Sequence, residues 1–68
     1  MDLRYAKIIY DCRMESGMSQ RQLGWESEVP PNTLCRYEQG LTIPRVDKFE
    51  AVLDACGYEL KVVKKKRK

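Results

Sequence analysis

Residues 18–40 read MSQRQLGWESEVPPNTLCRYEQG, and this stretch decides the fold. Ser19 is placed to cap a helix that we expect to reach about Ser27, because a serine oxygen can accept a backbone N–H of the first turn. Pro31 suits the first position of a second helix, which we expect to continue through about Tyr37. The glycine that closes the stretch can end that helix. Two short helices joined by a tight turn therefore form the centre of the chain.

Apolar spacing predicts further elements on both sides of this centre. Residues Leu3–Glu15 repeat apolar side chains at helical spacing after a cap at Asp2, and Gly17 can end that helix. A stripe after Pro44 predicts a helix that ends at Gly57. We expect the core to contain Leu23, Val29, Leu34, Tyr37, Ile43, Val46, Phe49, Val52, Leu53 and Cys56.

The last part of the chain changes its pattern. Residues Tyr58–Val63 alternate with a period of two, which predicts a short β-strand. The total charge is +3, of which Lys64–Lys68 supply +5, so residues 1–63 carry −2. We expect one domain over residues 1–63 and an unstructured basic tail over 64–68. The tail is either a nucleic-acid contact or a solvated end.

Composition narrows the classes of function. The chain of 68 residues is 43% apolar and 34% charged, with a mean hydropathy of −0.60, which excludes a membrane-embedded protein. It has no histidine, the commonest general base and metal ligand, so we expect no enzyme activity, metal site or cofactor. Cys12, Cys35 and Cys56 are spaced too widely for a disulfide framework or a zinc knuckle. Without a recognisable secretion signal, we expect a cytoplasmic protein.

The order of residues in the central stretch resembles the Cro/repressor (XRE-type) helix-turn-helix family. The upstream arginine of that family falls on Arg13, and its downstream proline and helix fall on residues 44–56. The resemblance spans Ile9–Gly57 and implies a mainly α fold of four to five helices, like that of lambda repressor, with the short C-terminal strand added. It also implies sequence-specific binding to duplex DNA by a transcriptional regulator, most simply an autoregulatory repressor. The central positions that match are Ser19, Gln20, Leu23, Val29, Glu38 and Gly40.

The same resemblance implies roles for individual residues. Asn32, Thr33 and Arg36, on helix Pro31–Tyr37, would face base edges in the major groove, which agrees with the chemistry of these side chains. An ion pair between Arg13 and Glu38 would join the first helix to the end of the third. The residues expected at the DNA backbone are Gln20, Arg13, Arg21 and Arg45, with Lys48 as a further candidate. Cys35 is interpreted as a packing residue, with a redox switch as the alternative.

Four residues depart from the family pattern. Glu28 replaces the usual turn glycine and would adopt a left-handed conformation at a cost, while Pro30 replaces the usual helix cap. Ser27 stands where a buried leucine is usual, and Trp25 stands at a position that usually faces outward. Two interpretations of Trp25 remain: the second helix is rotated so that the indole packs, or the indole is exposed and binds a partner.

The expected strand also bears on assembly. An unpaired strand edge invites pairing with a second copy, so Tyr58, Leu60 and Val62 are candidates for a homodimer contact. A twofold dimer would suit a palindromic DNA site, because it carries two recognition helices roughly 34 Å apart. The ending also resembles that of antitoxins. The alternative function is therefore an antitoxin or anti-repressor that neutralises a protein partner through Trp25, the strand or the tail.

Overall fold

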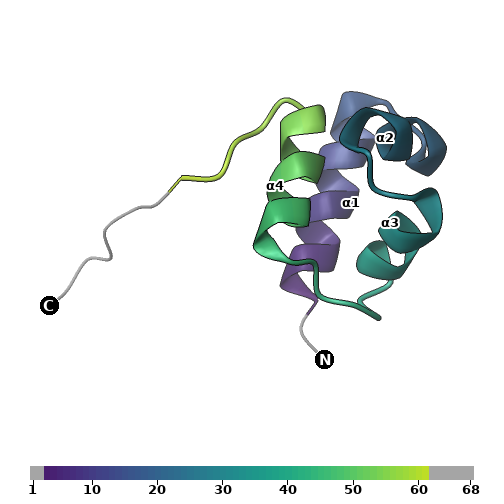
Figure 1. The fold of residues 1–68 in the computed structure, drawn as a ribbon, viewed down its shortest axis with the longest axis vertical. Helices are drawn as coiled ribbons and strands as arrows, with labels where there is room; N and C mark the ends of the chain where they lie inside the picture. Colours follow the sequence, from purple (N-terminus) through teal and green to yellow (C-terminus); the bar gives the residue numbers. More distant parts are fainter. Residues whose placement is uncertain (1–2, 62–68) are drawn as a thin grey trace, which may run out of the picture.

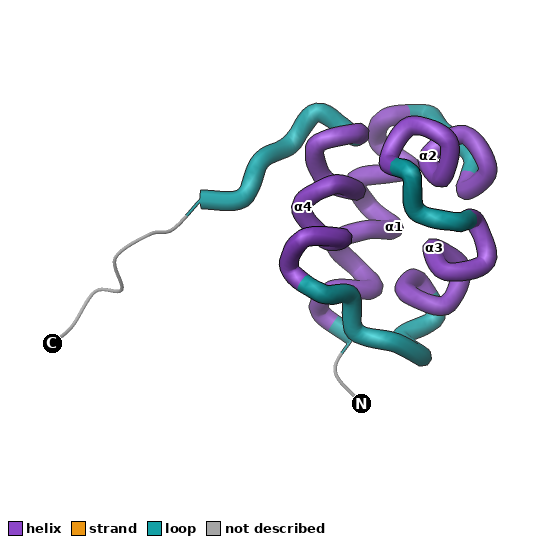
Figure 2. The backbone as a smooth tube through the Cα atoms, in the orientation of Figure 1, coloured by secondary structure: helices purple, strands orange, loops and turns teal. Residues whose placement is uncertain are grey.

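Four α-helices make up the part of the chain that the computed structural model describes, residues 3–61. They are α1 (Arg4–Ser16), α2 (Gln20–Ser27), α3 (Pro31–Glu38) and α4 (Val46–Ala55). The helix α2 packs against α3 and α4, and α1 packs across α3 and α4 (Figures 1 and 2). The expected mainly α fold is confirmed, and each helix begins or ends within a few residues of its predicted limits. No described helix has the length and apolar character needed to cross a membrane.

One hydrophobic core joins the four helices. Ile9, Leu23, Leu34 and Val52, one from each helix, are fully buried. The Tyr5 and Phe49 rings meet edge to face at 5.3 Å between centroids and extend the core between α1 and α4. The core prediction is confirmed by the burial of Leu23, Val29, Leu34, Tyr37, Phe49, Val52 and Leu53.

Three of the residues predicted for the core behave differently. Cys56 is half-buried and packs against the core from its edge. The prediction for Ile43 and Val46 is wrong, since 59% and 76% of their surfaces are exposed. Ile43 precedes α4, and Val46 is its first residue. The prediction from helical spacing therefore placed the start of the buried side of α4 about one turn too early.

The predicted helix limits are set largely by local backbone chemistry. Gly17 adopts the left-handed conformation (φ 79°) that ends α1. The backbone N–H of Gln22 donates to Ser19 Oγ at 3.0 Å, so Ser19 caps α2 as expected. At the start of α1 the cap position is Leu3, without a side-chain cap, and the proposed cap Asp2 lies outside the described residues.

The turn between α2 and α3 carries the expected departures. Glu28 is left-handed (φ 61°), a conformation that strains any residue with a Cβ. Pro30 gives α3 no side-chain cap, and Pro31 occupies its first turn. The buried Ser27 closes the turn, because its Oγ donates to Leu23 O at 2.7 Å and accepts from Val29 N–H at 3.3 Å.

A close backbone approach joins α2 to α3 at Gly24. A Cβ built on this residue would lie 2.8 Å from Val29 O and 3.0 Å from the Pro31 Cγ and Cδ atoms. Only a glycine fits without displacing the turn. Because α2 turns Leu23, Gly24 and Ser27 inward, Trp25 points away from the core and is 86% exposed. The interpretation in which Trp25 packs is therefore wrong.

The prediction of a C-terminal strand is also wrong in its described part. Within the described part of the segment, residues 58–61, the backbone forms no strand, and Tyr58 and Leu60 are exposed. A strand needs a neighbour to accept its backbone hydrogen bonds, and the four helices offer none. Val62, Val63 and the basic tail Lys64–Lys68 lie outside the described residues.

Candidate nucleic-acid interface

The helix α3 has a buried face and an open face. Leu34 and Tyr37 point into the core. Asn32 and Arg36 are exposed and Thr33 is half-exposed, and their spacing places all three on the outer side of the helix. The structure thus brings the three predicted base-reading residues together on one surface. Their amide, hydroxyl and guanidinium groups are the kinds of donor and acceptor that read base edges in a major groove.

A nearly buried ion pair fixes the end of α3 against α1. Arg13 Nε donates to Glu38 Oε2 at 2.7 Å and its Nη2 donates to Glu38 Oε1 at 2.9 Å, while Nη1 donates to Met18 O at 3.0 Å. Only 13% of the Arg13 side chain and 6% of the Glu38 side chain are exposed. The hydrogen bond to Glu38 raises the pKa of Arg13, against a smaller lowering by burial. This bidentate geometry fixes the direction of both side chains.

Gln20 completes this arrangement from α2. Its Nε2 donates to Glu38 Oε1 at 3.2 Å, so Glu38 accepts from residues on both α1 and α2. Gln20 is the first residue of α2, where free backbone N–H groups and the helix dipole favour an anion. A side chain predicted at the DNA backbone is therefore held in place by the same carboxylate that anchors α3.

One contributor to this network was missed from the sequence. The Arg13 guanidinium lies over the Tyr10 ring, 5.6 Å from its centroid. The sequence could have indicated this contact, because residues three apart on a helix lie on the same side and an arginine stacks readily on a tyrosine. Tyr10 therefore helps to hold the orientation of Arg13.

The remaining predicted backbone contacts lie apart from this network. Arg21 is exposed on α2, and Lys48 is exposed on α4. Arg45 Nε is 3.5 Å from Asp47 Oδ1, and both side chains are well exposed. Burial raises the pKa of the Tyr37 hydroxyl. Asp47 raises this pKa further and Arg45 lowers it, so both charged groups lie near the end of α3. The side chains of Arg21, Arg45 and Lys48 are exposed to solvent, and they do not come together in one site.

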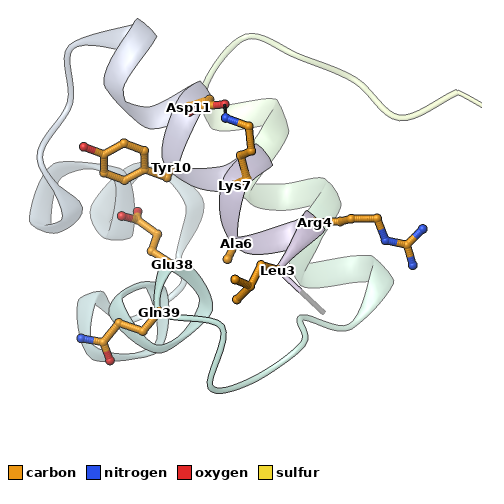
Figure 3. A pocket seen from close by; sticks show the side chains of 8 residues that line it. All are labelled: Leu3, Arg4, Ala6, Lys7, Tyr10, Asp11, Glu38 and Gln39. Carbon is orange, nitrogen blue, oxygen red and sulfur yellow. Dashed lines mark hydrogen bonds and ion pairs between the residues drawn. The ribbon is translucent and has the colours of Figure 1, made fainter. Parts of the chain in front are cut away.

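An open groove of about 690 Å³ lies between the first half of α1 and the end of α3. Ala6 and Tyr10 line it from α1, and Glu38 and Gln39 line it from the opposite side (Figure 3). Its two carboxylates are already paired, Asp11 with Lys7 at 3.1 Å and Glu38 with Arg13. Both carboxylates of the groove are therefore engaged in ion pairs.

The three cysteines are free thiols and half-buried. Burial raises the pKa of Cys12, and it also raises the pKa of Cys56, where the nearby Ser16 hydroxyl acts in the opposite direction. Cys35 is half-buried on α3 and, unlike Cys12 and Cys56, is not among the side chains packed against the core. Within residues 3–61, His, Cys, Asp and Glu side chains form no cluster of three or more that could hold a metal ion.

Comparison with known proteins gives one match. A family model described as a helix-turn-helix domain matches residues 11–61, which include the C-terminal part of α1 and all of α2, α3 and α4. No curated protein and no solved structure matches the chain. The family match therefore covers the exposed face of α3 and the Arg13–Glu38–Gln20 network that holds it.

Proposed function

The chain belongs to the family of helix-turn-helix domains, which bind DNA, and from that premise we propose that it reads a short duplex operator with α3 and represses transcription there. On this proposal it is a cytoplasmic regulator that works by occupying DNA, without catalysis and without a cofactor. The operator is most simply in its own promoter.

The observation that carries the proposal is the Arg13–Glu38–Gln20 network. It links α1, the first residue of α2 and the last residue of α3 through one nearly buried carboxylate. Such a joint holds the recognition helix at a fixed angle to the residue that would touch the backbone. Reading bases requires this rigidity, because a hydrogen bond to a base edge tolerates little misplacement.

The three outer residues of α3 supply the proposed sequence choice. Asn32 can form paired hydrogen bonds with adenine, Arg36 can do so with guanine, and Thr33 can contact a thymine methyl group. Gln20, Arg13, Arg21 and Arg45 would contact phosphates and supply affinity that depends on salt and not on sequence. The basic tail Lys64–Lys68 would add to this second group.

Selection from a library of random duplexes tests the proposal. The full chain should enrich a defined motif, and Asn32→Ala and Arg36→Ala should each lose about 1–3 kcal/mol of discrimination at one position of it. Arg21→Ala is the matched control, because it should weaken binding to every duplex equally and flatten the salt dependence. Enrichment of no motif, or unchanged selectivity in both α3 variants, would overturn the proposal.

Repression is tested in cells with the enriched motif. A reporter promoter that overlaps the motif should fall in activity when the chain is expressed, and it should recover with Arg36→Ala. We propose that two copies bind together, since a twofold pair of recognition helices reads a palindrome. An enriched motif without twofold symmetry would contradict this pairing.

Trp25 favours a second candidate function, that of an antitoxin or anti-repressor. An indole that is 86% exposed contributes nothing to the core, and exposed tryptophan side chains are frequent anchors of protein contacts. The test is co-expression with the product of an adjacent gene. A stoichiometric complex that Trp25→Ala abolishes while DNA binding persists would support this function, and a complex indifferent to the substitution would contradict it.

A further inference from the structure

The loop between α3 and α4 exposes a leucine just after the end of α3. Leu41 is 57% exposed and follows the left-handed Gly40 (φ 75°), at which the chain leaves the helix. This loop runs along one end of the bundle, from the end of α3 to the start of α4 (Figures 1 and 2). Leu41 is not among the apolar side chains that form the core or pack against it. The fold therefore does not use this leucine as a core residue.

Backbone hydrogen bonds hold Leu41 against the end of α3. Gly40 N–H donates to Tyr37 O at 3.1 Å, and Leu41 N–H donates to Arg36 O at 3.0 Å. These two bonds around a left-handed glycine form the Schellman ending of a helix. In this ending, the side chain that follows the glycine frequently contacts the residues three and four positions before the helix cap, which here are Arg36 and Cys35. Leu41 therefore stands beside Arg36.

Arg36 is the side chain that we propose to read guanine. It is exposed on the outer side of α3, one turn after Asn32. The exposed outer surface thus continues from Asn32 through Arg36 to Leu41, and it changes from polar to apolar at its last member. Neighbouring base pairs are stacked about 3.4 Å apart, so a side chain beside the guanidinium reaches the base pair next to that guanine.

The chemistry of the leucine side chain limits what it can recognise on DNA. It has neither a donor nor an acceptor, so it forms no hydrogen bond with a base edge or a phosphate. The apolar group that base edges present in the major groove is the C5-methyl group of thymine. Leu41 therefore matches thymine by apolar contact.

We propose that Leu41 is a specificity-determining residue that contacts the C5-methyl group of a thymine in the base pair next to the guanine read by Arg36. The inference rests on the proposed function, because it requires α3 to lie in the major groove. The two residues then read one step of two base pairs together, Arg36 through hydrogen bonds and Leu41 through apolar contact. The loop thereby adds a base preference beyond the end of the helix.

Replacement of thymine by deoxyuridine tests the contact, because deoxyuridine differs from thymidine by the methyl group alone. Each thymine of the enriched duplex is replaced in turn, and binding of the full chain is measured by fluorescence anisotropy. The burial of one methyl group corresponds to about a fourfold change in affinity. The wild-type chain should show this loss at a thymine next to the guanine that Arg36→Ala ceases to select. Leu41→Ala should bind the two duplexes equally at that position.

Two further variants separate the contact from an effect on folding. Leu41→Met keeps an apolar side chain and should remain sensitive to the methyl group. Ile43→Ala is the matched control, because Ile43 is 59% exposed in the same loop but lies two residues further from α3. This variant should keep the full preference for thymine. Circular dichroism of each variant before the titration checks that it is folded.

Three results would overturn the inference and leave the proposed function standing. The first is a selected motif without thymine beside that guanine, or a wild-type chain that tolerates deoxyuridine there. The second is a Leu41→Ala variant that keeps the preference for thymine. The third is an equal loss of the preference in Ile43→Ala, which would show that the loop acts without a specific contact. Enrichment of no motif at all would overturn both the inference and the proposed function.

Discussion

The outer side of α3 and the two ends of α4 expose different kinds of side chain. On α3 the exposed groups are polar, and behind them Glu38 accepts hydrogen bonds from two other elements. At the two ends of α4, apolar side chains (Ile43, Val46, Tyr58 and Leu60) are exposed among charged ones. The first surface is suited to the polar edges and charged backbone of DNA, and the second to another protein surface. A domain this small can hold both because they lie on different helices.

This difference implies that substitutions behind α3 and substitutions at the exposed residues of α4 have different effects on the free energy of unfolding. Changes behind α3 should lower the free energy of unfolding, because they break contacts within one chain. Changes at the exposed residues of α4 should leave folding largely intact, because those side chains face solvent.

Glu38→Ala should have the largest effect on folding. It removes the partner of a nearly buried guanidinium, so the free energy of unfolding should fall by about 3 kcal/mol. Urea denaturation followed by circular dichroism measures the loss. Glu38→Gln, which keeps an acceptor for Gln20 and Arg13, should lose less. A loss below about 0.5 kcal/mol for Glu38→Ala would show that the network does not hold α3.

Gly24→Ala should come next, with a loss of about 2 kcal/mol. The new Cβ would meet the Val29 carbonyl at 2.8 Å, and the cost of moving the turn should exceed the gain of up to about 1 kcal/mol in helix propensity. Gln22→Ala, on the exposed side of α2, is the matched control and should stay close to wild type. If Gly24→Ala proves neutral or stabilising under the same denaturation, the close approach of α2 to the turn is not required.

Glu28→Gly should stabilise the chain by about 0.5–1 kcal/mol. Glycine accepts the left-handed conformation at φ 61° without steric cost, and this relief should exceed the entropy that glycine adds to the unfolded chain. The thermal midpoint of unfolding measures the gain. Glu28→Ala removes the carboxylate but keeps the strain, so an equal gain in both variants would assign the effect to charge.

Val46→Ser should have the smallest effect on folding, within about 0.5 kcal/mol, because its side chain is largely exposed in one copy. A large loss of stability at a concentration where the chain is monomeric would show that Val46 supports the fold itself, and the contrast between the two surfaces would then fail.

Several features of the fold were predictable because their causes act over a few residues. Ser19 accepts a bond from a residue three positions away, Gly17 adopts its own left-handed conformation, and Pro31 carries its own preferred φ. Glu28 was expected to be strained for the same local reason. The pairing of Arg13 with Glu38, 25 residues apart, was implied by family resemblance and not by spacing.

The failed predictions concern surfaces and partners. Helical spacing placed Val46 in the core and left the direction of Trp25 open, because a periodic pattern does not say where the neighbouring elements end. The expected strand over Tyr58–Val63 failed in its described part, because alternation signals a strand only when another strand is present to pair with it.

The amino-acid sequence alone determined the four helices, the tight turn and the polar outer positions of α3, since caps, turn residues and periodicity act through nearby backbone. The packing of segments that are distant in the sequence decided which side chains are buried and which are exposed. It brought Gly24 against the turn, enclosed Glu38 between Arg13 and Gln20, and left Trp25 and Val46 outside. Burial depends on which elements meet in space, and their meeting is a property of the whole chain.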